Sequence, residues 1–128
     1  MSRTTDIPPI DQVRPEHHRL GVIFEETAAN LEAGEGRVAC GELRDALEAH
    51  FGQEEALYYP TLWKLHPEHE SKLRTLITAH EGLLIALDRI IGLLEGGNSA
   101  EAQEGFRRLR EQFAVHERAE EAVLLSMS

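Results

Sequence analysis

Two histidine–glutamate pairs with the same spacing stand out in the sequence. His50 and Glu54 form the first pair, within HFGQEEALYYP, and His116 and Glu120 form the second, within HERAEE. Residues four apart lie on one face of an α-helix, and in both segments the rest of that face is mostly apolar. Imidazole and carboxylate groups are both ligands of transition metals, so this repeated pattern makes a metal site the first chemistry to consider.

The segments around these pairs predict four long helices. Leucine, alanine and glutamate are abundant and aromatic residues make up only 5% of the chain, which favours helix over sheet. Proline and glycine mark the boundaries, with Pro60 ending the second helix and Ser99 serving as N-cap of the fourth. We expect an extended lead-in over residues 1–12 and helices over about 15–33, 38–59, 67–94 and 99–125.

Each predicted helix carries a stripe of residues at alternating steps of three and four, the spacing of a buried seam. The stripes are Val13, His17, Leu20, Phe24, Thr27 and Leu31; Leu43, Leu47, His50, Glu54 and Leu57; Leu73, Leu76, His80, Leu83, Leu87, Ile90 and Leu94; and Phe106, Leu109, Phe113, His116, Glu120 and Val123. Four such stripes joined by short loops predict an all-α fold. We expect one domain over residues 13–128, an antiparallel up-down-up-down four-helix bundle.

Apart from Thr27, these stripes are apolar except at six ionisable residues: His17, His50, Glu54, His80, His116 and Glu120. In antiparallel neighbours, residues equidistant from the connecting turn lie at the same height, which puts His17 level with Glu54 and His80 level with His116. Buried carboxylates need a compensating partner, since each alone costs several kcal/mol. A pair of metal ions fits best, with histidines capping each ion and the two glutamates bridging between them.

Simpler interpretations apply to each residue singly. A lone histidine on an apolar face is usually a core residue, and a single His-x-x-x-Glu pair is common on solvated helices. The joint pattern favours the metal. His18 is the alternative to His17 on a poorer stripe, and Glu55, Glu81, Glu117 and Glu121 lie beside the stripes, either supporting the ligands or facing solvent. Either Tyr58 or Tyr59 could reach the metals or only pack, and His66 and His69 are expected in solvent.

The chain resembles the hemerythrin-like, or HHE cation-binding, domains over about residues 13–125. EHHRL, HFGQEEALYYP, the His80-Glu81 pair and HERAEE match the four ligand segments of that family in order and spacing. HFxxEE followed by an aromatic residue and proline is the most specific of them. The oxygen-carrying hemerythrins have a further histidine one turn after the third segment's ligand, where this chain has Leu84, and place their last carboxylate at the position of Glu121.

The resemblance implies a di-iron centre with an oxo or hydroxo bridge, held in a four-helix bundle and reactive toward oxygen, nitric oxide or peroxide. His17, His50, His80 and His116 would be terminal ligands, and Glu54 and Glu120 would bridge. With four histidines the set is most similar to the branch implicated in nitric oxide responses and repair of iron centres. Two alternatives stay open, namely a di-iron enzyme (peroxidase, nitric oxide reductase or iron donor) and a zinc-binding or metal-free interaction bundle.

Composition limits the possible partners and compartment. A formal net charge of −10 argues against nucleic acid and anionic membranes, because phosphate contact needs a basic face. The apolar runs are too short for a signal peptide or a membrane span, so we expect a cytoplasmic protein. The single cysteine, Cys40, cannot form an internal disulfide and is expected to act as a small apolar residue. The expected partner is a small diatomic or peroxide ligand, and no protein partner can be read from the sequence.

Overall fold

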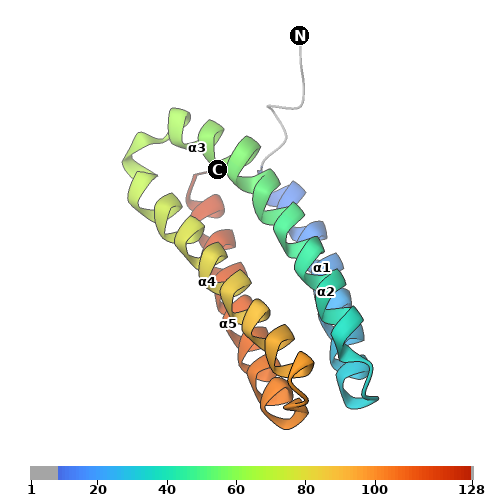
Figure 1. Ribbon diagram of the computed structural model, residues 1–128. Helices are drawn as coiled ribbons and strands as arrows, with labels where there is room; N and C mark the ends of the chain where they lie inside the picture. Colours follow the sequence, from blue (N-terminus) through green and yellow to red (C-terminus); the bar gives the residue numbers. More distant parts are fainter. Residues whose placement is uncertain (1–8, 128) are drawn as a thin grey trace.

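The computed structural model describes residues 9–127, and every secondary-structure element among them is helical. The long helices are α1 (Pro9–Glu32), α2 (Gly36–Gln53), α4 (Glu70–Glu95) and α5 (Ser99–Ser126) (Figure 1). Between α2 and α4 lie a π-helical turn η2 (Glu54–Tyr58), a short helix α3 (Tyr59–Leu65) and a 3-10 turn η3 (Pro67–His69). The predicted all-α class is confirmed, and the four long helices are consistent with a helical bundle.

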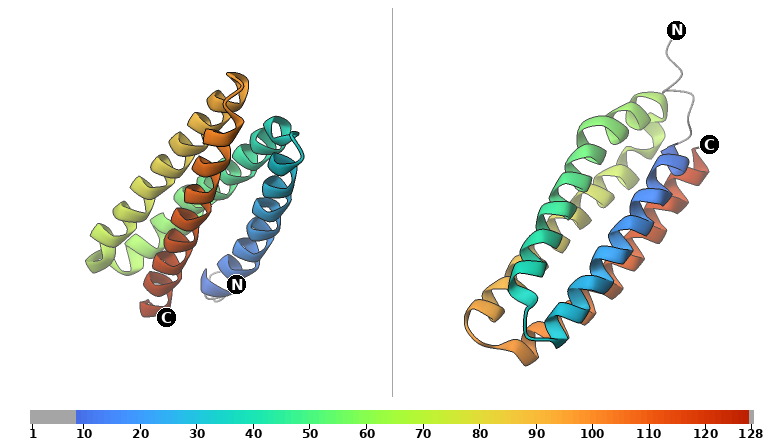
Figure 2. Two further views of the ribbon diagram at one scale, coloured as in Figure 1. Left: turned by 90° about the horizontal axis from the view of Figure 1, so that it is seen from below. Right: turned by 90° about the vertical axis from the view of Figure 1, so that its right-hand side faces the viewer.

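The long helices lie side by side and form a ring. Helix α1 packs against α2 and α5, α2 packs against α4, and α4 packs against α5. The start of α1, the short helix α3 and the end of α5 lie at one end of the molecule, and the turns after α1 and α4 lie at the other (Figures 1 and 2). Gly34 and Gly97 have φ near +80° in these turns, a conformation that glycine adopts without strain.

Helix α1 starts earlier than expected, at Pro9. The predicted extended lead-in over residues 1–12 is therefore wrong for residues 9–12, and residues 1–8 lie outside the described part of the chain. Ile10 and Val13 are buried in a cluster with Leu124. This burial stabilises the extra turn and offsets the backbone hydrogen bond that Pro15 cannot make inside the helix.

Pro60 does not end the second helix. The wider π turn precedes it, and the backbone N–H of Tyr59 bonds to the carbonyl of Glu54, five residues earlier. Proline lacks an N–H and its ring crowds the carbonyl of the preceding turn in a regular α-helix, so a locally widened turn lets the chain continue. The helical path goes on to Leu65, and the corner falls at His66 and η3.

The π turn also changes which residues face inward. It adds one residue to the helical repeat, so the inward position after Glu54 is Tyr59, which is 3% exposed. Leu57, predicted to lie in the seam, is instead 58% exposed. The prediction fails at Leu57 because the three-and-four spacing assumes an uninterrupted α-helix.

Other departures from the expected boundaries and seams are small. Helix α4 begins at Glu70 after the 3-10 turn, and Asn98, not Ser99, is the N-cap residue of α5. Leu94 and Val123 are only partly buried, and Leu124 takes the inward position at the end of α5. These shifts of one to three residues are the usual uncertainty of helix ends.

Two hydrophobic clusters fill the interior, one toward each end. The larger, nearer the two glycine turns, includes Leu20, Phe51, Leu83 and Phe113. The smaller, nearer α3, includes Val13, Tyr59, Leu76 and Leu124. Along α1, α4 and α5 the ionisable stripe residues fall between members of the two clusters. Along α2, Phe51 of the larger cluster lies between His50 and Glu54. The fold therefore places the six residues in a layer with hydrocarbon on both sides.

Candidate metal centre

All six predicted ligands are buried, and none is more than 7% exposed. They form two overlapping groups of four, and within each group one potential ligand atom per residue lies within 4.8 Å of all the others. His17 and His50 belong to one group, His80 and His116 to the other, and Glu54 and Glu120 belong to both. This arrangement offers two adjacent cation positions with a pair of histidines on each and two carboxylates shared between them.

Three of the histidines direct Nε2 at the shared carboxylates. Nε2 of His17 lies 2.8 Å from Oε1 of Glu120. On the other glutamate, Nε2 of His50 lies 3.2 Å from Oε2 of Glu54, and Nε2 of His80 lies 3.2 Å from Oε1. The nitrogen and oxygen donors therefore converge from four helices on one small space. Glu120 faces a histidine of α1, and Glu54 faces one histidine of α4 and one of the preceding turn of its own helical path.

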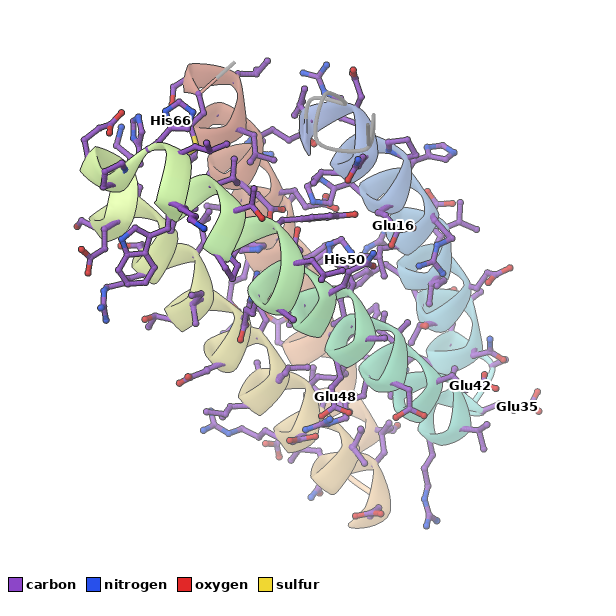
Figure 3. All side chains as sticks on the ribbon, turned by 90° about the horizontal axis from the view of Figure 1, so that it is seen from above. Glu16, Glu35, Glu42, Glu48, His50 and His66 are labelled. Atoms are coloured by element: carbon purple, nitrogen blue, oxygen red, sulfur yellow. The ribbon has the colours of Figure 1, made fainter. Side chains whose placement is uncertain are left out.

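The outer nitrogens of the same three histidines are held by a second set of carboxylates. Nδ1 of His17 lies 2.8 Å from Glu121. Nδ1 of His80 lies 2.7 Å from Glu55, and Nδ1 of His50 lies 3.4 Å from Glu16, which faces it from α1 (Figure 3). A carboxylate on the outer N–H fixes the tautomer and ring orientation of a metal-binding histidine and raises its basicity.

His116 provides a test of whether a cation fits. Both of its ring nitrogens are buried and neither has a hydrogen-bond partner. A buried donor or acceptor left unsatisfied costs about 1–3 kcal/mol, and native structures avoid this cost. A cation bound between His80, His116 and the two glutamates would satisfy one of these nitrogens and neutralise the carboxylates, so the donor set fits transition-metal binding.

Comparison with known families identifies the same kind of site. The hemerythrin HHE cation-binding domain matches residues 8–128. The chain belongs to this family. No curated protein and no solved structure matches the chain.

The structure of this hemerythrin domain shows where the residues lie between which the sequence left a choice. His18 is exposed and lies away from the layer, whereas His17 is inside it. Glu120 is fully buried among the six, whereas Glu121 is partly exposed and holds the outer nitrogen of His17. Glu81 is exposed at the surface. Sequence reasoning overlooked Glu16, although its position directly before His17 was a usable signal.

Tyr59 is the further polar group inside the centre. Its hydroxyl makes a short hydrogen bond to Oε2 of Glu120. The hydroxyl oxygen of Tyr59 also lies 3.4 Å from Oε1 of Glu54 and 3.4 Å from Nε2 of His80. Tyr58, the other candidate, is half-buried, and its hydroxyl meets only the side chain of Gln53 at 3.4 Å. The π turn thus gives this hemerythrin domain a phenol at the shared carboxylates.

Burial and close contact distribute protons unevenly over the centre. Burial, reinforced by the neighbouring Glu54, raises the pKa of Glu120 to about 7. Burial acts the same way on Glu54, but hydrogen bonds from His50 and His80 outweigh it and hold the pKa of Glu54 well below its usual range. Burial opposes protonation of His17, yet its bonds to Glu120 and Glu121 raise its pKa to about 9. Burial, together with nearby His80, lowers the pKa of His116 to about 4.

The remaining candidate residues lie elsewhere in the hemerythrin domain. Leu84, one turn after His80, is half-buried and packs against the larger hydrophobic cluster, so each half of the centre has two histidines. His66 and His69 flank the corner at η3 and are partly buried, although the sequence placed them in solvent. No described helix has the combination of length and hydropathy that a membrane span requires.

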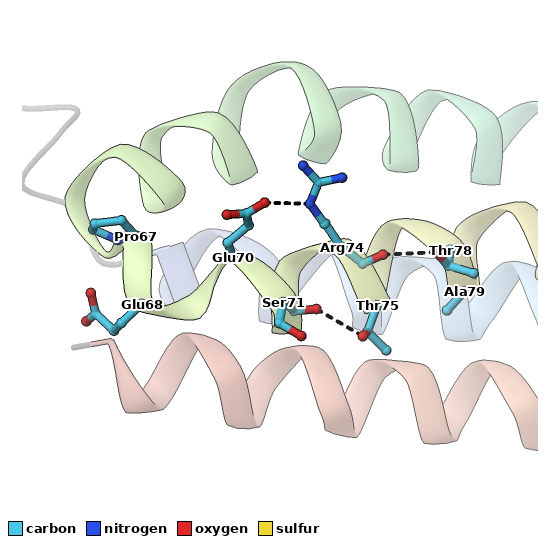
Figure 4. A pocket seen from close by; sticks show the side chains of 8 residues that line it. All are labelled: Pro67, Glu68, Glu70, Ser71, Arg74, Thr75, Thr78 and Ala79. Atoms are coloured by element: carbon cyan, nitrogen blue, oxygen red, sulfur yellow. Dashed lines mark hydrogen bonds and ion pairs between the residues drawn. The ribbon is translucent and has the colours of Figure 1, made fainter.

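A hollow of about 800 Å³ lies along η3 and the first turns of α4, apart from the six residues of the centre (Figure 4). Its lining is formed by residues between Pro67 and Ala79, and Glu70 and Arg74 bridge one another across a turn at 2.7 Å. The guanidinium carbon of Arg74 lies over the ring of Trp63, 5.2 Å from its centre. The hollow is therefore part of a solvent-exposed helix face, and none of the residues that line it is a candidate ligand.

Proposed function

We propose that the chain is a non-haem di-iron protein that binds, senses or reacts with a small oxidant: oxygen, nitric oxide or peroxide. The observation that carries the proposal is the pair of four-residue groups that share Glu54 and Glu120. Two shared carboxylates hold two cations close together, which favours an oxo- or hydroxo-bridged pair over two independent sites. Family membership supports iron as the metal.

The proposal gives each of the six residues a role. His17 and His50 would bind one iron, His80 and His116 the other, and Glu54 and Glu120 would bridge the two. Two nitrogens and two carboxylate oxygens leave each iron short of six ligands, and the open positions would accept the small oxidant. When bound, the irons supply the electrons for binding or reducing that oxidant. The hydrocarbon clusters on both sides limit the access of water and larger molecules.

A di-iron enzyme is the second candidate, and Tyr59 is the observation that favours it. Its hydroxyl is buried and touches both shared carboxylates, so it holds a proton beside the place where an oxidant would be reduced. Burial and the adjacent Glu120 and Glu54 raise the pKa of Tyr59, which keeps it protonated in the absence of metal. Steady-state consumption of peroxide or nitric oxide by the iron-loaded protein would support this alternative.

The remaining features of the proposal concern topology and context. We take the four long helices as an antiparallel up-down-up-down bundle, which the short turns at Gly34 and Gly97 support. We also propose a cytoplasmic location and no nucleic-acid or membrane partner, for which the net charge of −10 is the argument. The ligand in the cell is then a small molecule that diffuses freely.

Metal analysis of purified, iron-reconstituted protein tests the proposal directly. We expect two irons per chain and near-ultraviolet absorption from a bridged ferric pair. His50→Ala should lose at least one iron per chain, whereas His69→Ala, outside both groups, should retain two. Equal iron in all three proteins, or zinc in place of iron without colour after reconstitution, would contradict the assignment.

A further inference from the structure

The carboxylates that hold the outer histidine nitrogens follow a regular order around the ring of helices. Glu16 of α1 reaches His50 of α2, and Glu55 of η2, which continues α2, reaches His80 of α4. Glu121 of α5 reaches His17 of α1 and closes the ring. Each of these histidines therefore takes its outer partner from the preceding helix in the order α1, α2, α4, α5. The one step of this order that is missing is a carboxylate of α4 on His116 of α5, whose ring nitrogens have no hydrogen-bond partner.

The residue expected at the vacant step can be identified from the other three. Each outer carboxylate is the direct sequence neighbour of a proposed ligand: Glu16 precedes His17, Glu55 follows Glu54, and Glu121 follows Glu120. Helices α1 and α4 both run from the α3 end toward the two glycine turns (Figure 1). The position on α4 that corresponds to Glu16 is therefore the residue before His80, which is Ala79.

No carboxylate lines the surface at this position, and neither ring nitrogen of His116 has a hydrogen-bond partner. Ala79 and His116 line the same groove between α4 and α5, with a volume of about 420 Å³. Gly82 and Ala86 line it too, and a Cβ added at Gly82 would meet nothing within 4 Å. Small residues thus leave a gap where the other three steps have a glutamate. Whichever nitrogen of His116 faces the metal, the other one has no carboxylate.

We propose that the two halves of the centre are unequal, and that the half formed by His80 and His116 holds its metal more weakly and exchanges it first. The inference rests on the proposed metal centre. In the half formed by His17 and His50, both histidines are oriented and made more basic by outer carboxylates. In the half formed by His80 and His116, only His80 has an outer carboxylate. Loss of an outer partner typically lowers metal affinity about 10- to 100-fold.

The test is a Co²⁺ titration of the full-length metal-free protein against a competing chelator. We expect two binding events whose dissociation constants differ at least about 10-fold. Ala79→Glu installs the missing carboxylate and should tighten the weaker event about 10-fold. Thr78→Glu is the matched control, because it adds the same charge one residue away at an exposed position that lines the hollow along α4 (Figure 4) but not the groove with His116. It should change neither event more than about twofold.

Three further variants assign the events to the halves. Glu16→Gln removes the carboxylate at the corresponding position of α1 and should weaken the tighter event. His116→Ala should abolish the weaker event and leave a single Co²⁺ per chain, whereas His50→Ala should remove the tighter one. Circular dichroism melting of each variant confirms that it is folded.

The outcomes separate this inference from the proposed function. Failure of the wild type to bind any metal would overturn both. Three outcomes would overturn only the inequality of the halves, since the wild type would still bind two metals. They are two equal events in the wild type, equal responses to Ala79→Glu and Thr78→Glu, and loss of the tighter event in His116→Ala.

Discussion

The hydroxyl of Tyr59 donates a hydrogen bond to Oε2 of Glu120, which ties the residue after the π turn to the last helix of the bundle. Both side chains are buried, and Glu120 is fully so. The contact depends on the π turn, because only the added residue brings Tyr59 to the inward face.

Replacing Tyr59 by phenylalanine should destabilise the metal-free protein by about 1–3 kcal/mol, because the buried Glu120 oxygen loses its donor. Metal binding should reduce this difference, since a cation satisfies the same carboxylate. Urea unfolding with and without metal measures both effects. Tyr58→Phe is the control and should change stability by less than about 0.5 kcal/mol, because its hydroxyl makes only a long contact with Gln53. A similar loss in both variants would contradict the role assigned to the Tyr59 hydroxyl.

Leu57 should tolerate a charged residue, although its spacing resembles that of a core leucine. Leu57→Lys is expected to change the free energy of unfolding by no more than about 0.5 kcal/mol, because the π turn leaves Leu57 largely in solvent. Leu47→Ala, at a fully buried position of the same stripe, should cost about 2–5 kcal/mol. Thermal or chemical denaturation compares the two. Strong destabilisation by Leu57→Lys would mean that α2 continues as a regular α-helix.

Cys40 should react slowly with thiol reagents in the folded protein. It is fully buried, and burial raises the pKa of its thiol to about 11. The thiolate that attacks such reagents is therefore scarce at pH 8, and access is blocked as well. Colour development with an aromatic disulfide reagent should be slow under native conditions and immediate in denaturant. Rapid labelling of the native protein would show that the start of α2 opens easily.

The raised pKa of Cys40 also determines how the stability of the folded protein changes with pH. The folded protein holds the thiol proton more strongly than the unfolded chain, whose thiol has a pKa near 9.0. This contribution to the free energy of unfolding is complete below about pH 9 and declines as the pH rises toward about 11. Cys40→Ala should lack this part of the alkaline decline, which urea unfolding at pH 8 and pH 10.5 can measure.

Metal affinity should increase with pH through the neutral range. A ligand histidine must be neutral, but His17 has its pKa raised to about 9 in the metal-free protein, since bonds to Glu120 and Glu121 outweigh burial. A proton therefore competes with the metal below about pH 9, and binding at pH 7 should release it. Glu121→Gln removes one of those bonds and should reduce the proton release at about pH 9, near the raised pKa of His17, measured with an indicator dye during titration. Release unchanged in this variant would contradict the assigned cause.

The sequence by itself determined the helical class and the membership of the buried layer. Both follow from spacing within a single helix, because residues three and four apart must share a face whatever the helix packs against. His17, His50, His80 and His116 are recognisable as candidate ligands for that reason, since each occupies a stripe whose other positions are mostly apolar. The family resemblance rests on the same local segments.

Only the tertiary structure decided the relationships between helices. Glu16, Glu55 and Glu121 each bond a histidine of another helix, and such pairings depend on the rotation and axial shift of two packed helices. The unpaired His116 is visible only in the same way. The π turn was equally hidden, because a π turn is rare and the three-and-four spacing assumes a regular α-helix. Packing of Tyr59 against the interior decides that Tyr59 and not Leu57 faces inward.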